Sequence, residues 1–291
     1  FGRPKVVSDV RVLPSHRFAS RMIDTGAYLF VFVAGLITAL ATGLGAVPFF
    51  LVDDIGDRWN VVLWGLASGI MLGASLFGLV SEGLAYGGPL ELGVGVLAGV
   101  VLGVVAHEVI EGAEVDPGVY EEADFKKLLL ILGVLTVHSF PEGVAVGVSF
   151  AELGFDTPGG VLVFGTAVPL LAVFMTVAIS IHNVPEGVAV SIPLRSMDVS
   201  PPRMVWWAVF SSLPQPVGAV IAFYFVTLAE RFLPIGFGFA AGAMVYLVLT
   251  EFIPEALELG EGLAGGGKRE LVAGVLVGVG AMVPLLSVTS V

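Results

Sequence analysis

Long apolar stretches separated by short polar segments set the pattern of this chain. At about 20 residues per crossing, each stretch is long enough to span a bilayer. The stretches lie near residues 27–52, 60–85, 89–111, 126–151, 161–191, 204–229, 233–256 and 270–290. This pattern predicts an all-α integral membrane protein with eight transmembrane helices. Strand-like alternation with a period of two is not apparent, which disfavours a β-barrel.

The connections between the stretches are short, so the pattern leaves no room for a separate soluble domain. We expect residues 1–26 to form a basic N-terminal tail and residues 27–291 to form one transmembrane domain. The longest predicted loop runs from Gly112 to Lys127.

Composition agrees with this class and narrows the chemistry. Hydrophobic residues make up 56% of the chain, charged residues only 13%, and the mean hydropathy is +0.97, as in membrane proteins. The net charge of −12 argues against nucleic-acid binding. Since cysteine is absent, a metal would be held by imidazole, carboxylate, amide or water ligands.

One short motif occurs twice within the predicted membrane spans. It reads HSFPEG from His138 and HNVPEG from His182. Residues four apart lie on one helical face, so His138 stacks with Glu142 and His182 with Glu186. Ionisable residues at bilayer depth indicate function, and two imidazoles with two carboxylates suit a divalent metal. The motifs therefore predict a metal site between the fourth and fifth helices.

A proline stands before the glutamate in each motif. Pro141 and Pro185 cannot donate a backbone hydrogen bond, which frees part of the carbonyl four residues earlier. Transporters build midplane ion sites from such interrupted helices. The alternative is a pair of kinks whose polar residues join helices. That alternative does not explain the same His and Glu at the same offsets twice.

Basic residues in the loops indicate an orientation, but the tail conflicts with it. The loops after the first, third, fifth and seventh helices hold most of the loop Lys and Arg, whereas the opposite loops hold only Arg231. By the positive-inside rule both termini lie outside. The tail carries Arg3, Lys5, Arg11, Arg17 and Arg21, which favours the reverse.

The paired motifs, together with Ala41–Pro48 (ATGLGAVP) and Ala240–Val245 (AAGAMV), resemble the ZIP (Zrt/Irt-like protein) divalent-metal transporters, closest to the GufA-like branch. The resemblance implies an inverted-repeat bundle in the plasma membrane with both termini extracytoplasmic. It implies uptake of zinc foremost, or of iron, manganese or cadmium, into the cytoplasm, and we expect alternating access. The metal is then substrate, with no resident cofactor, and the partners are metal ions and the lipid bilayer. The oligomeric state stays open, with a homodimer as one candidate.

The resemblance also assigns roles to individual residues. The principal site falls on His138, Glu142, His182 and Glu186. A second, neighbouring site of binuclear members corresponds here to the two glutamates with Ser139, Asn183 and Gln215. Ser139 replaces an asparagine and Gln215 a glutamate. Since the second site has lost a charge, we expect one tightly bound ion.

Further acidic and histidine residues gather at the predicted cytoplasmic helix ends. Glu251 and Glu255 repeat the Pro-Glu spacing around Pro254, while His107 and Glu111 end the third helix on the same side. These residues predict an exit pathway for the ion. The alternative is that they reach headgroup water, and we weigh it equally for Glu108 and Glu255.

Two other function classes remain open from the sequence. A membrane zinc metallohydrolase would also use histidine and glutamate, but it typically keeps an open coordination position and a separate base. No HExxH motif appears, so we expect a protein that is not an enzyme. A metal sensor that transports nothing is the other alternative.

Overall fold

The computed structural model describes residues 25–52, 55–111, 138–153, 160–228 and 232–284. Within these ranges, six helical segments are long and apolar enough to cross a membrane. They are Thr25–Phe50, Asp57–Tyr86, Pro89–Glu108, Leu170–Ile192, Pro201–Leu228 and Leu233–Leu259. The chain is therefore a mostly helical, multi-pass membrane protein, as the apolar pattern predicts.

Several spans combine an α-helix with a more tightly or more loosely wound segment. Helix α2 (Thr25–Thr42) continues as the 3₁₀ segment η2 (Gly43–Phe50), which contains Pro48. Helix α3 (Asp57–Gly73) continues through the π-helical η3 (Ala74–Val80) into α4 (Ser81–Tyr86). Helix α5 spans Pro89–Glu111, and residues 138–149 form the next described helix.

The C-terminal half also contains α-helices that continue into differently wound segments. Helix α7 spans Leu170–Ser196, α8 Pro201–Ser211 and α9 Pro214–Leu228. Helix α10 (Leu233–Leu247) leads through the π-helical η5 (Val248–Phe252) into α11 (Ile253–Leu259), and α12 spans Lys268–Met282. The predicted spans 126–151 and 270–290 are described only in part, so the count of eight helices stays a prediction. Residues 1–24 of the predicted tail and the Gly112–Lys127 loop lie outside the described residues.

The expectation of a helix from residue 161 is wrong. Strands β1 (Val161–Val163) and β2 (Thr166–Val168) form an antiparallel hairpin, with Val163 paired to Thr166. Valine and threonine favour strands, and Phe164 and Gly165 turn the chain with φ angles of 49° and 81°. The helix begins only after Pro169, a residue suited to a helix start.

The span expected at 204–229 is one membrane-spanning segment, Pro201–Leu228, but it consists of two helices, α8 and α9. The chain turns at Ser212 and Leu213, whose amides donate to Val209 O and Phe210 O, before α9 begins at Pro214. Pro214 and Pro216 supply no amide hydrogen, which explains why α8 does not continue. The turn sets Gln215 in the first turn of α9, where it is fully buried.

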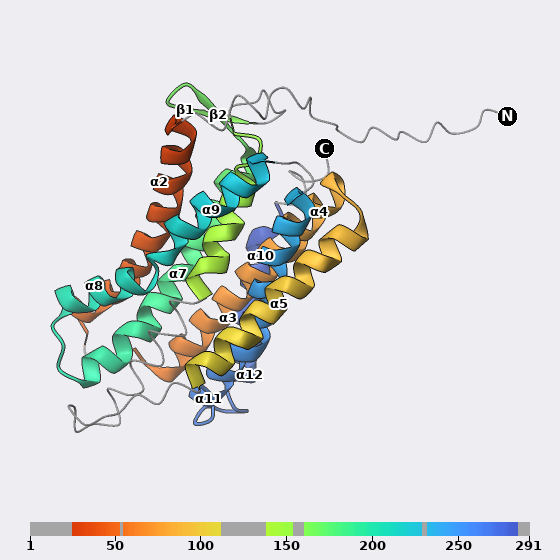
Figure 1. Ribbon diagram of the computed structural model, residues 1–291. Coiled ribbons are helices and arrows are strands. Elements are labelled where there is room, and N and C mark those ends of the chain that lie inside the picture. Colours follow the sequence, from red (N-terminus) through yellow and green to blue (C-terminus); the bar gives the residue numbers. More distant parts are fainter. Residues whose placement is uncertain (1–24, 53–54, 112–137, 154–159, 229–231, 285–291) are drawn as a thin grey trace.

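Close helix pairs form two parts of the bundle (Figure 1). In one part α3 packs on α12 and α5 on α10, and in the other α2 packs on α7 and α9. Glycine permits the approach, since a Cβ added at Gly99 of α5 would lie 2.1 Å from Phe239 O of α10. Likewise, a Cβ at Gly143 would lie 2.1 Å from Gln215 O, which brings residues 138–149 against α9.

Apolar side chains cover much of the outside of this bundle, and polar ones are enclosed within it. Exposed residues on α5 include Leu90, Val94, Leu97, Val101 and Val105, a face suited to lipid. In contrast His138, Glu142, His182, Asn183 and Glu186 are all buried. The fold thus places both motifs in its interior.

Candidate metal site

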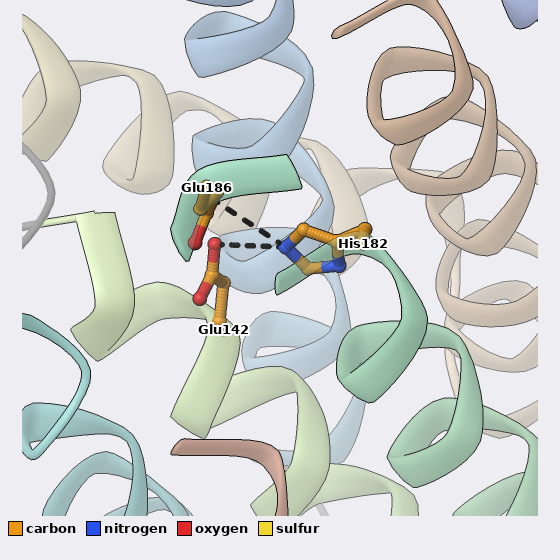
Figure 2. A group of neighbouring side chains, drawn as sticks. All are labelled: Glu142, His182 and Glu186. Carbon is orange, nitrogen blue, oxygen red and sulfur yellow. Dashed lines mark hydrogen bonds and ion pairs between the residues drawn. The ribbon is translucent and has the colours of Figure 1, made fainter. Parts of the chain in front are cut away.

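Three of the four motif residues converge on one point inside the bundle. Glu142 comes from the helix of residues 138–149, and His182 and Glu186 come from α7. His182 Nε2 lies 3.1 Å from Glu142 Oε1 and 3.7 Å from Glu186 Oε1. Figure 2 shows the three side chains pointing toward one another. One ligand atom from each lies within 4.8 Å of the others.

The spacing of this group suits a metal ion. Two ligand atoms held at about 2.1 Å from a tetrahedral zinc ion lie about 3.4 Å apart. The separations of 3.1 and 3.7 Å bracket that value. All three side chains are at most 2% exposed, so water does not offset the two carboxylate charges. Burying two carboxylates beside one imidazole is costly unless a cation is shared between them.

His138 is buried but lies apart from this group. It lines a small pocket with Pro141 and with residues of α5 and α10, among them Ala106 and Leu247. Its Nδ1 has no hydrogen-bond partner among the described residues. The structure therefore brings together three of the four predicted ligands and turns the fourth toward the neighbouring helices.

Gln215 and Asn183 fix the position of Glu142 through a chain of hydrogen bonds. Gln215 donates from Nε2 to Glu142 Oε2 at 2.5 Å, and its Oε1 accepts from Asn183 Nδ2 at 3.1 Å. Asn183 Nδ2 also donates to the carbonyl oxygen of Thr38 in α2, at 2.8 Å. These bonds tie α7, α9 and α2 to the orientation of Glu142. Ser139, which follows His138 in the sequence, is buried, with 1% of its surface exposed.

Glycine lets α2 and its continuation approach α7 just past the motif. A Cβ added at Gly187 would lie 1.8 Å from Thr42 O, and one at Gly45 would lie 2.3 Å from Val184 O. The glycine that ends each repeated motif is therefore needed for packing beside the site. Its role explains why the motif extends one residue past the glutamate.

The predicted exit residues are partly grouped. His107 Nδ1 of α5 lies 2.8 Å from Glu251 Oε1 of the π-helical η5, and both side chains are partly exposed. Glu255 lies half-buried in the first turn of α11, and Glu108 is exposed. Glu111 ends α5, but the structure does not describe its side chain.

Two polar contacts between segments far apart in sequence have no signal in the sequence. The hydroxyls of Thr42 and Ser212 lie 2.7 Å apart, joining the end of α2 to the turn before α9. Tyr86, at the end of α4, donates a hydrogen bond to Glu152, which follows the helix of residues 138–149. Neither Tyr86 nor Thr42 belongs to the repeated His-Glu motif.

Comparison with known proteins identifies the family. A model of the ZIP Zinc transporter family matches residues 160–286, a range that holds His182, Glu186 and Gln215. The zinc transporter GufA of Myxococcus xanthus is 33% identical over 262 residues, covering 84% of this chain and 93% of that protein. The zinc transporter ZupT of Chlorobaculum parvum is 32% identical over 275 residues, covering 86% and 95%.

A longer relative matches more closely over part of its length. A putative zinc transporter of Arabidopsis thaliana is 42% identical over 225 residues, which cover 77% of this chain but only 34% of that protein. The chain thus spans about a third of the plant protein but nearly the whole of the two bacterial ones. Since relatives more than 30% identical match most of this chain and nearly all of their own length, the chain belongs to the ZIP family of zinc transporters.

Proposed function

We propose that this protein carries divalent metal ions across a membrane, with zinc as the principal cargo. Its relatives are zinc transporters rather than enzymes, which sets the metallohydrolase alternative aside. Iron, manganese and cadmium remain further candidate cargoes, because nitrogen and oxygen ligands also accept them. No resident cofactor is part of this proposal.

The observation that carries the proposal is the convergence of Glu142, His182 and Glu186 in the bundle interior. We infer that these side chains hold the ion during its passage. One imidazole and two carboxylates compensate a divalent charge, and the enclosed site keeps water from competing. An ion held by side chains from two separate helices is released when those helices move relative to each other, as alternating access requires.

His138 extends this site toward the next part of the route. It lies one helical turn before Glu142, and its pocket reaches Ala106 and Leu247. Ala106 precedes His107, and Leu247 lies one turn before Glu251. We therefore place His138 as a fourth ligand that hands the ion from the buried group to the His107 and Glu251 pair. Glu255 and Glu111 continue the same path to the helix ends.

The direction of transport follows from the topology proposed for the chain. The loop charges put the ends of α5 and α11 in the cytoplasm, so the path from His138 to Glu255 leads inward. Both termini are then extracytoplasmic, and the plasma membrane is the proposed location. Residues 1–26 act as a tail to the transmembrane domain of residues 27–291, and a homodimer is compatible with this scheme.

We propose that one ion at a time is tightly bound. Glu142 Oε2 already accepts a hydrogen bond from Gln215, and Asn183 holds Gln215 in that position. A second ion would need the same carboxylate oxygen. Neither Gln215 nor Ser139 offers a negative charge to attract it.

Transport by the purified protein tests this function. Liposomes that contain the protein and a trapped zinc-sensitive dye are exposed to zinc, iron(II), manganese or cadmium, with protein-free liposomes as the control. We expect zinc to enter only the protein-containing liposomes. Zinc binding without entry would instead assign the chain as a sensor. The absence of both zinc binding and zinc entry would overturn the proposal.

A further inference from the structure

A pocket whose lining includes none of the motif residues lies between the beginnings of α3 and α12. It has a volume of about 460 Å³ and is lined by Arg58, Trp59, Val62, Arg269, Glu270 and Ala273. All six residues belong to the first two turns of α3 or α12. The side chains of the pocket differ from those of the metal site, because the pocket contains two guanidinium groups and the metal site contains carboxylates and an imidazole.

The two helices run parallel, so their beginnings meet at one face of the membrane. A Cβ added at Gly65 would lie 2.5 Å from Leu271 O, and one at Gly69 would lie 2.3 Å from Val275 O. Further along, Gly73 lies against Met282. Contacts that advance together along both helices require a parallel pair. Arg58 and Arg269 therefore both lie at the end where the two helices enter the bilayer.

The pocket carries net positive charge in a protein whose net charge is −12. Arg58 Nε pairs with Glu270 Oε1 at 3.3 Å, which neutralises the one carboxylate that lines the pocket. The structure pairs Arg269 with no charged group among the described residues, and its side chain is exposed. Among the described residues, Glu270 is the charged partner that the structure gives Arg58. Two guanidinium groups thus line the pocket.

The wall below the arginines is apolar and faces outward. Trp59 is 67% exposed, as expected for an aromatic ring at the headgroup level. Along α12 the pocket residues Arg269 and Ala273 are followed on the same face by Leu276 and Val277, which are 67% and 63% exposed. A charged head and an apolar strip are thus arranged along the membrane normal.

From this arrangement we infer that the pocket binds an anionic phospholipid. Its phosphate lies between Arg58 and Arg269, and an acyl chain lies along Leu276 and Val277. Basic pockets between membrane helices recognise acidic headgroups in this way, and the planar guanidinium matches phosphate oxygens. A bound lipid would tie the start of α3 to the start of α12 and stabilise the pair.

Thermal unfolding of the purified protein in neutral detergent tests the inference. Phosphatidylglycerol is added in one series, phosphatidylcholine in a second and soluble glycerol 3-phosphate in a third. We expect phosphatidylglycerol alone to raise the Tm, and native mass spectrometry to find it bound at one copy per chain. The Arg269→Gln variant should bind phosphatidylglycerol about fivefold more weakly, as expected for the loss of one basic residue near the surface.

The matched control is Arg203→Gln, which removes an exposed arginine at the start of α8, outside the pocket. It should bind phosphatidylglycerol like the parent. The double variant R58Q/E270Q removes the ion pair without leaving a lone carboxylate, and it too should weaken binding. If R58Q/E270Q does not fold, the comparison of Arg269→Gln with Arg203→Gln still decides.

Four results would overturn the inference. They are equal stabilisation by phosphatidylcholine, equal stabilisation by glycerol 3-phosphate, equal weakening by Arg203→Gln, and loss of a dimer instead of lipid in Arg269→Gln. The second would show a site for small anions, and the last would assign the pocket to contact between two copies of the chain.

Discussion

Gln215 donates a hydrogen bond to Glu142 Oε2 at 2.5 Å, on the side of the carboxylate away from His182. In this hydrogen bond Glu142 Oε2 accepts from a neutral amide, so Glu142 Oε1 is the oxygen that can bind a metal ion. Gln215 is held in turn by Asn183, so its amide cannot rotate freely to offer its carbonyl oxygen instead. The hydrogen bonds among Glu142, Gln215 and Asn183, which come from three different helices, thus favour the binding of a single ion.

The first prediction concerns the number of ions bound. A carboxylate at position 215 would attract a second cation by about 4 kcal/mol per unit of charge at 4 Å, in an effective dielectric of about 20. We expect one tightly bound zinc ion per chain in the parent and a second one in Gln215→Glu, measured by elemental analysis and calorimetry. Gln215→Asn, which adds no charge, is the control. Two equally tight ions in the parent protein would contradict the role given to Gln215.

The second prediction separates the two histidines. His182 is part of the buried group, so His182→Ala should weaken zinc binding by more than about a hundredfold, beyond the loss seen when a group merely supports a ligand. His138 faces the pocket toward α5 and α10, so His138→Ala should slow transport more than it weakens binding. Calorimetry and liposome uptake measure the two effects. If both variants lose binding equally, His138 is a full member of the resting site.

Part of this picture follows from the sequence alone. The apolar stretches place most spans within a few residues, because spanning length and hydrophobicity depend on local composition. The repeated motif predicts that His182 shares a helical face with Glu186, and His138 with Glu142, because residues four apart lie on one side of a helix. These inferences need only local geometry.

Other features depend on contacts that local patterns do not carry. The hairpin at Val161–Val168 is as apolar as a membrane span, and only its valines and the Phe164–Gly165 turn distinguish it. The pocket that His138 lines is formed with residues of α5 and α10, which lie far from it in sequence. The break before Pro214 could be read from its prolines, yet the bond from Gln215 to Glu142 needs the distance between two helices.

The third prediction concerns topology. The parent has no cysteine, so a single introduced thiol reports its own location. Ser200→Cys, in the loop before α8, should be protected from an impermeant thiol reagent in intact cells. Leu162→Cys, on the exposed hairpin strand β1, should react. The opposite labelling of the two sites would reverse the proposed orientation of the termini.

The fourth prediction concerns the packing beside the site. A methyl group at Gly187 would lie 1.8 Å from Thr42 O, so the backbones of α7 and α2 must separate in Gly187→Ala. We expect the variant to lose about 1–3 kcal/mol or more of stability, as for other overpacked positions. Gly280→Ala in α12 is the control, because a Cβ there meets nothing within 4 Å. Thermal unfolding in detergent measures the stability of both variants. Equal melting temperatures would show that α2 and α7 can accommodate a methyl group at position 187.

Zinc uptake by liposomes that contain Glu142→Gln tests the central claim most directly. This substitution removes a charge that the buried group shares and keeps the shape of the side chain. Glu258→Gln, at an exposed position of α11, removes the same charge away from the site. With equal amounts of folded protein, Glu142→Gln should slow the initial rate of zinc entry by about tenfold or more, and Glu258→Gln should match the parent. Parental zinc entry in Glu142→Gln would contradict the account, because the ion would then cross the membrane without the group of Glu142, His182 and Glu186.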